Sequence, residues 1–92
     1  MRQNQSPFYV KKRFGLDSFL FDLSQLYEIV VFSSGQKRYV ESIIDQIDPK
    51  NRISYVLSRE HCITINKYHY IKNLNALGRN LDSVILIDVS YF

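Results

Sequence analysis

The stretch Ile29-Val30-Val31-Phe32-Ser33-Ser34-Gly35 decides the fold of this chain. Its first four residues are apolar and mostly β-branched, which is typical of a strand buried on both faces. The strand, which we expect over residues 27–32, ends on two hydroxyl side chains. Ligands of parallel sheets bind beyond the carboxyl ends of the strands, so Ser33 stands where a ligand is expected.

The segments on both sides of this strand complete an α/β pattern. Apolar residues recur at helical spacing from Leu16 to Leu23 and from Val40 to Ile47, where Asp48-Pro49 ends the second helix. The remaining elements that we expect are strands at 8–12, 53–57 and 84–88, a hairpin of 62–65 with 68–71 around Asn66-Lys67, and a helical turn within 74–81 closed by Gly78. Strands alternating with helices predict a mainly parallel sheet.

Length and composition exclude several classes of protein. A chain of 92 residues forms one domain at most, which we place at residues 8–92 after a flexible segment at 1–7. Its longest apolar runs are far shorter than the roughly 20 residues that span a bilayer, so we expect no membrane partner. The single cysteine, Cys62, excludes an intrachain disulfide and fits a reducing, intracellular compartment. Nucleic acid is a minor alternative, because only Lys11-Lys12-Arg13 and the net charge of +3 favour it.

Three side chains at strand ends or adjoining loops form a candidate phosphate site. A hydroxyl such as Ser33 donates to a phosphate oxygen, a lysine such as Lys72 supplies a compact positive charge, and an aspartate such as Asp88 binds Mg²⁺. Each residue also has a purely structural interpretation. Ser33 could cap the next helix, Lys72 could be a solvated lysine, and Asp88 could be a turn former. Their order along the chain is more specific than any one of them.

These residues belong to longer segments that resemble one family. They are Val10 to Asp17, Tyr27 to Ser33, Arg59-Glu60-His61-Cys62, and Lys72 with Leu77-Gly78-Arg79-Asn80-Leu81. In this order they resemble the RNA polymerase II C-terminal-domain phosphatases, also called the nuclear LIM interactor-interacting factor domain, within the haloacid dehalogenase superfamily. The resemblance runs from about Tyr9 to Asp88.

The resemblance implies a role for each matching residue. Ser33, Arg59 and Lys72 correspond to positions that bind phosphate, and Tyr39 falls where the family often places an aromatic residue against the substrate. Asp88 corresponds to a ligand of Mg²⁺. The implied activity is Mg²⁺-dependent dephosphorylation of phosphoserine or phosphothreonine in proteins through a phosphoaspartate, in a nuclear or cytoplasmic setting. The implied fold is a three-layer haloacid-dehalogenase-like domain with a small β-hairpin insertion.

The sequence departs from this family at the catalytic centre. The family's first motif is Asp-x-Asp, whose first aspartate is the nucleophile, and these 92 residues contain no Asp-x-Asp. We therefore expect a partial fold, truncated at both ends, whose central first-motif strand is missing. The fourth motif is also altered, because Val89 follows Asp88. With one carboxylate left, Mg²⁺ would be bound weakly or not at all.

Two functional interpretations follow from these departures. The first is a phosphatase-family domain that has no activity alone, because positioning a phosphate does not replace the nucleophile. The alternative is a non-catalytic binding module like the presequence-receptor subunit of the mitochondrial inner-membrane translocase, which resembles the same family and shares the turn Phe32-Ser33-Ser34. A missing central strand would also leave open sheet edges, which favours self-association.

Overall fold

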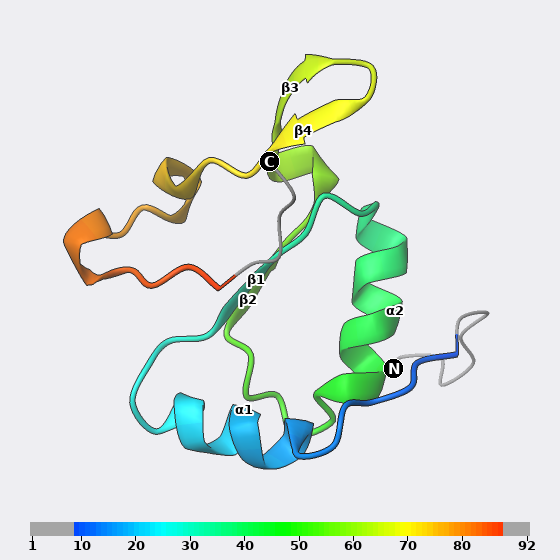
Figure 1. Ribbon diagram of the computed structural model, residues 1–92, viewed down its shortest axis with the longest axis vertical. Helices are drawn as coiled ribbons and strands as arrows, with labels where there is room; N and C mark the ends of the chain where they lie inside the picture. The colour runs from blue at the N-terminus through cyan, green and yellow to red at the C-terminus, as the bar shows by residue number, and fades with distance from the viewer. Residues whose placement is uncertain (1–8, 88–92) are drawn as a thin grey trace.

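The computed structural model describes residues 9–87. The elements in chain order are α1 (Leu16–Ser24), β1 (Val30–Phe32), α2 (Lys37–Ile47), β2 (Tyr55–Leu57), the 3₁₀ turn η1 (Arg59–His61), β3 (Ile63–Asn66), β4 (His69–Ile71), and the 3₁₀ turns η2 (Leu74–Leu77) and η3 (Leu81–Ser83). In Figure 1, α2 lies on one side of β1 and β2, and the segment that carries η2 and η3 lies on the other.

The strands β1 and β2 form a parallel sheet, as the sequence predicts. Val30 lies opposite Tyr55, Val31 opposite Val56, and Phe32 opposite Leu57. Parallel pairing places the carboxyl ends of both strands at the same edge of the sheet, and the ladder continues past β1, where the Ser33 backbone N–H donates to Leu57 O at 2.9 Å. The two loops that follow these strands, residues 33–36 and 58–62, therefore lie side by side.

Helix α2 begins close to this edge, and Val40 is its buried residue. Val40 is 4% exposed, and its N–H donates to the oxygen of Gln36. The helix ends at Ile47, just before Asp48-Pro49, as predicted. The carboxylate of Asp48 is buried and accepts hydrogen bonds from the backbone N–H groups of Arg52 at 2.9 Å and Ile53 at 2.8 Å. This aspartate thereby fixes the turn that leads into β2.

Helix α1 confirms the predicted helix after Gly15 but is only partly covered. Gly15 adopts a φ of 82°, a left-handed conformation that glycine reaches without steric penalty. Leu20 is the only buried residue of the helix. Arg52 attaches the helix to the rest of the structure, because its Nη1 donates to the backbone oxygen and to a carboxylate oxygen of Asp17, both at 3.0 Å.

The hairpin forms a separate antiparallel sheet, with its turn one residue later than predicted. β3 extends to Asn66 and β4 begins at His69, so the turn is Lys67-Tyr68 and not Asn66-Lys67. The cause is the Asn66 side chain, whose Oδ1 accepts a hydrogen bond from the Tyr68 N–H at 2.9 Å. A register irregularity between Thr64 and Asn66 accompanies this shift.

Two predicted strands do not form in the described residues. Residues 84–87 make no strand, and the side chains of Ile85, Leu86 and Ile87 are exposed. Residues 9–12 are also without strand structure, and Phe8, the first residue of that predicted strand, lies outside the described range. The reason for the missing strand at 84–87 is the lack of a neighbour, because within residues 9–87 β1 pairs with β2 alone.

The buried interior of residues 9–87 is small. The buried apolar side chains are Leu20 and Val40, and the buried polar residues are Asp48 and Ser58. The observed fold is thus a small α/β arrangement with a parallel two-stranded sheet and a separate hairpin. In the part of the chain that is described, no helix is long and apolar enough to cross a membrane.

Candidate functional site

The candidate site begins with Ser33, the first residue after β1. Its Oγ accepts a hydrogen bond from the backbone N–H of Gly35 at 3.0 Å, and the residue is half-buried. A serine hydroxyl that accepts in this way still has its own proton to donate. Ser33 can therefore offer one oriented O–H to an anion beyond the strand end.

Gly35 brings Tyr39 next to Ser33. A Cβ atom at Gly35 would lie 3.2 Å from Ser33 Oγ, 3.2 Å from Tyr39 Cδ2 and 3.1 Å from Val40 Cγ2. Such distances are tighter than ordinary van der Waals contact, so only a residue without a side chain fits here without displacing its neighbours. The tyrosine of α2 and the serine of the β1 loop thus approach each other over a glycine.

Arg59 joins the loop after β2 to the loop after β1. Its backbone N–H donates to Gly35 O, and its Nε donates to Ser34 O, both at 2.9 Å. The guanidinium carbon lies 4.7 Å from the centre of the Tyr70 ring, which belongs to the hairpin strand β4. Arg59 is therefore held on three sides, with its cationic group at the carboxyl ends of both strands.

Lys72 follows β4 by one residue and is half-buried. It lies two positions beyond Tyr70, so the hairpin links it to the residue that contacts Arg59. Asp88, the predicted metal ligand, lies outside the described residues.

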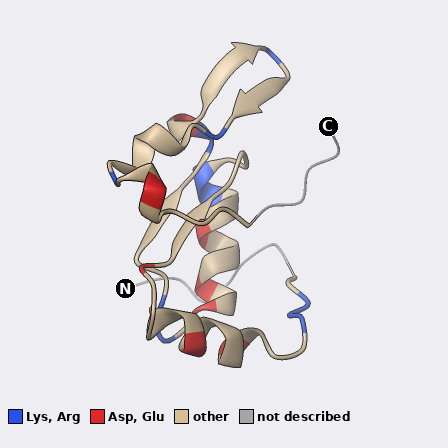
Figure 2. Cartoon of the chain, turned by 60° about the vertical axis from the view of Figure 1, so that its left-hand side comes forward, with Lys and Arg blue, Asp and Glu red and all other residues tan. Residues whose placement is uncertain are grey.

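Figure 2 shows basic residues at the tip and base of the hairpin and at the start of α2, and acidic residues along the two helices.

The predicted site residues are thus brought together to different degrees. Contacts join Ser33 to Tyr39 through Gly35, and Ser33 to Arg59 through the loop of residues 33–35. Helix α2 adds the partial positive charge of its N-terminus, since it starts four residues after Ser33 and has no acidic residue in its first turn. Such an arrangement of a hydroxyl, a guanidinium and a helix N-terminus suits a phosphate group.

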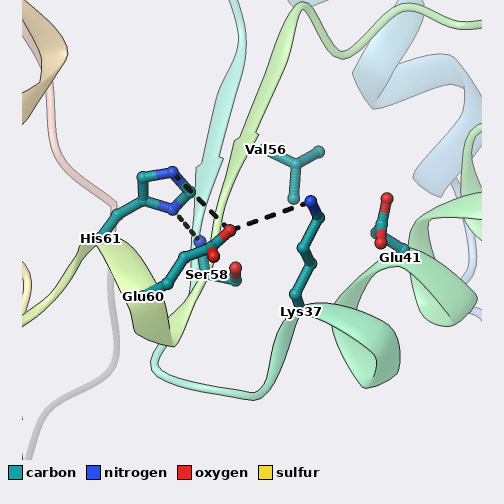
Figure 3. Close-up of a pocket in the computed structure, with 6 residues that line it drawn as sticks. All are labelled: Lys37, Glu41, Val56, Ser58, Glu60 and His61. Carbon is teal, nitrogen blue, oxygen red and sulfur yellow. Dashed lines mark hydrogen bonds and ion pairs between the residues drawn. The ribbon is translucent and has the colours of Figure 1, made fainter.

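A pocket of about 260 Å³ borders η1 and the start of α2, and none of the predicted site residues lines it (Figure 3). It is lined by Lys37, Glu41, Val56, Ser58, Glu60 and His61. Glu60 Oε1 lies 4.0 Å from both Lys37 Nζ and His61 Nε2, while His61 Nδ1 accepts a hydrogen bond from the Ser58 N–H at 3.0 Å. Because a carboxylate already faces both basic groups, this pocket is less suited to a phosphate than the loop beside Arg59.

Sequence reasoning missed Tyr70, Gly35 as a close-approach position, and the Glu28–Arg79 ion pair. Arg79 donates to both oxygens of Glu28, from Nε at 2.8 Å and from Nη2 at 3.0 Å. This hydrogen-bonded guanidinium lowers the pKa of Glu28 and raises the pKa of Arg79. Nothing in the sequence marks a pair 51 residues apart, and only the fold brings it together.

Comparison with known proteins shows the family to which the chain belongs. The family described as NLI interacting factor-like phosphatase matches residues 1–92. The chain belongs to this family. The resemblance stated from the sequence motifs is therefore confirmed, and the predicted site residues lie on a domain of this phosphatase family.

The proteins to which the chain is similar include phosphatases and a mitochondrial protein. The chain is 37% identical over 82 residues to CTD small phosphatase-like protein 2 of Dictyostelium discoideum (89% of this chain, 14% of that protein). It is 39% identical over 82 residues to phosphatase PSR1 of Saccharomyces cerevisiae (89% and 19%). It is 46% identical over 85 residues to the mitochondrial import inner membrane translocase subunit TIM50 of Kluyveromyces lactis (91% and 18%). The chain thus spans less than a fifth of the length of these relatives.

Proposed function

We propose that this chain binds a phosphorylated serine or threonine side chain of a protein at the carboxyl ends of β1 and β2. Ser33, Arg59 and Lys72 bind the phosphate, and Tyr39 contacts the neighbouring part of the peptide. The observation that supports this most is the attachment of Arg59 to the loop after β1, with Nε on Ser34 O and the backbone N–H on Gly35 O. A cation held this way loses little conformational freedom when it binds an anion.

Ser33, Arg59 and Lys72 would each make a different kind of interaction with the phosphate. The Ser33 hydroxyl donates one directional hydrogen bond, while the planar guanidinium of Arg59 offers its two Nη groups, which make no hydrogen bond to other described residues. Lys72 adds a compact positive charge. Together they neutralise the charge spread over the phosphate oxygens.

We further propose that the chain alone does not hydrolyse the phosphate ester. Attack on phosphorus in this family's reaction needs the aspartate of an Asp-x-Asp motif, and the 92 residues contain none. Binding groups do not replace that carboxylate, because phosphate monoester hydrolysis requires rate enhancements of up to about 10²¹-fold.

We also propose that this chain binds Mg²⁺ weakly or not at all. No group of three or more His, Cys, Asp or Glu side chains gathers within residues 9–87, and the proposed ligand Asp88 lies outside them. Mg²⁺ prefers several oxygen ligands. The proposed phosphate binding therefore relies on the protein's own donors and cations.

The test compares a phosphoserine peptide with the same peptide unphosphorylated, measured by fluorescence anisotropy at fixed salt. We expect the phosphorylated peptide to bind at least tenfold more tightly, and Arg59→Ala to abolish that difference. Arg13→Ala removes the same charge from an exposed position before α1 and serves as the control. Equal affinity for both peptides, or equal losses in the two variants, would contradict the proposal.

A second candidate function is a non-catalytic binding module of mitochondrial protein import. The observation that favours it is sequence identity. The chain is 46–49% identical to the TIM50 subunits of Kluyveromyces lactis and Candida glabrata, and 37–39% identical to the two phosphatases named above. The ligand would be a basic amphipathic presequence, and the setting would be mitochondrial and not nuclear or cytoplasmic. Tighter binding of a presequence peptide than of the phosphopeptide, unaffected by Arg59→Ala, would support this function over the first.

We also propose that the open edge of β1 pairs with a second copy of the chain. Within residues 9–87 this edge has no strand beside it, while the side chains of Ile85, Leu86 and Ile87 are exposed and their β-prone segment belongs to no strand. If two copies exchanged this segment, it would cover the open edge of β1 in each copy and would itself gain a neighbouring strand. Sedimentation at rising concentration should show a dimer that Ile85→Lys weakens, whereas a monomer at all concentrations would exclude it.

A further inference from the structure

The hairpin strand β4 supplies one of the contacts that hold Arg59. The guanidinium carbon of Arg59 stands 4.7 Å from the centre of the Tyr70 ring, within the range of a cation–π interaction. At the edge of the guanidinium, Nε donates to Ser34 O at 2.9 Å. The group is therefore held by an aromatic ring of the hairpin over its face and by the backbone of the loop after β1 at its edge.

The orientation of β4 makes this contact specific to Tyr70. Side chains alternate along a strand, and within His69–Ile71 only Tyr70 is half-buried while its two neighbours are exposed. Tyr68, in the turn, is 83% exposed. Of the tyrosines of the hairpin, Tyr70 is thus the one that faces the body of the protein.

We propose that Tyr70 is a positioning residue that holds the Arg59 guanidinium toward the phosphate, so that the hairpin tunes phosphate affinity. This inference rests on the proposed function of Arg59. An arginine side chain loses much rotamer freedom when it is fixed in one geometry, and the ring and the Ser34 oxygen impose that geometry before the ligand arrives. Because Lys72 follows Tyr70 by two residues, docking of the hairpin also sets the position of the second cation.

Substitution of the ring should weaken binding without removing it. We expect Tyr70→Ala to lower the affinity for the phosphoserine peptide about two- to fivefold, which corresponds to a partly exposed cation–π contact. Tyr70→Phe keeps a ring face and should bind like the parent protein. Tyr68→Ala removes an exposed tyrosine of the same hairpin and should have no effect.

A double-mutant cycle separates positioning from general destabilisation. In an Arg59→Ala background, Tyr70→Ala should cause no further loss of affinity, because its effect acts through Arg59. A merely structural role would lower affinity in both backgrounds. An equal loss in the two backgrounds would therefore overturn the inference, as would an unchanged affinity in Tyr70→Ala.

A second measurement needs no ligand and is independent of the proposed function. In the free 92-residue protein, we expect the Arg59 Nε–H resonance to show a ring-current shift and slow exchange with water, because it is stacked on Tyr70 and bonded to Ser34 O. Tyr70→Phe should retain both properties and Tyr70→Ala should lose them. An unchanged resonance in Tyr70→Ala would refute the positioning role, whereas absent phosphopeptide binding by the parent protein would refute only the proposed function.

Discussion

The Oγ of Ser33 accepts a hydrogen bond from the backbone N–H of Gly35 at 3.0 Å. This bond fixes the serine side chain at the carboxyl end of β1 and leaves its hydroxyl proton for another acceptor. The same short loop also accepts hydrogen bonds from Arg59, at Ser34 O and Gly35 O. A donor and a cation are thus fixed on one loop of three residues.

Ser33→Ala should lower the affinity for a phosphoserine peptide about tenfold or more, because a hydrogen bond to a charged group contributes roughly 1.5–3 kcal/mol. Ser33→Thr keeps the hydroxyl and should retain most of the affinity. Ser34→Ala is the matched control, since Ser34 contributes its backbone oxygen and has an exposed side chain. Fluorescence anisotropy measures all three, and equal losses in the two alanine variants would count against the assigned role of Ser33.

Gly35→Ala should impair both stability and binding. The added methyl group would stand 3.1–3.2 Å from Val40, Ser33 and Tyr39, and overpacking of this kind costs about 1–3 kcal/mol. Gly78→Ala is a useful comparison, because Gly78 has a φ of 67° and open space around it. That substitution should lower the free energy of unfolding by about 1 kcal/mol and leave phosphopeptide affinity unchanged. Urea denaturation and anisotropy on both variants distinguish the two outcomes.

Asp48→Ala should be among the most destabilising polar substitutions in the chain. Asp48 is 4% exposed, and its loss would leave the backbone N–H groups of Arg52 and Ile53 without their acceptors. Each unsatisfied buried group costs about 1–3 kcal/mol. Asp22→Ala, at an exposed position of α1, should change the free energy of unfolding by much less. Similar urea midpoints for the two variants would contradict this account of the turn before β2.

The Glu28–Arg79 pair should make stability depend on pH in the acid range. The hydrogen bonds from Arg79 lower the pKa of Glu28 in the folded protein below its usual 4.5, so the pair stabilises the fold fully above that pH. The contribution is lost as the pH falls through the lowered value. The parent protein should therefore melt at a higher temperature than Glu28→Gln at pH 7, and the difference should close in acid. A difference that stays constant down to the acid limit of the fold would contradict the pairing.

Helical periodicity and breaker residues were sufficient to predict the two helices. Asp48-Pro49 marks the end of α2 because proline disfavours helical conformation in the residue before it. The parallel direction of the sheet strands also followed from the alternation of helices and strands, whereas the pairing of β1 with β2 is known from the structure. The hairpin turn was predicted one residue early, because the hydrogen bond from the Tyr68 N–H to the Asn66 side chain depends on local geometry that spacing does not reveal.

The segment Val84 to Ile87 shows where local reasoning fails. Its composition favours a strand, but a strand needs a neighbour, and none lies beside it within residues 9–87. Family motifs assign the candidate site to Ser33, Tyr39, Arg59 and Lys72, and these roles stay predictions. Tyr70 could not be predicted, because its role comes from the docking of a hairpin ring on an arginine 11 positions earlier in the chain.

The most direct test measures binding of one phosphoserine peptide and release of inorganic phosphate together. It uses the 92-residue protein with added Mg²⁺. We predict saturable binding that Arg59→Ala weakens at least tenfold, with no release of inorganic phosphate above the buffer control. Mg²⁺-dependent release by the parent protein that Arg59→Ala abolishes would contradict the claim that this chain binds phosphate without hydrolysing the ester.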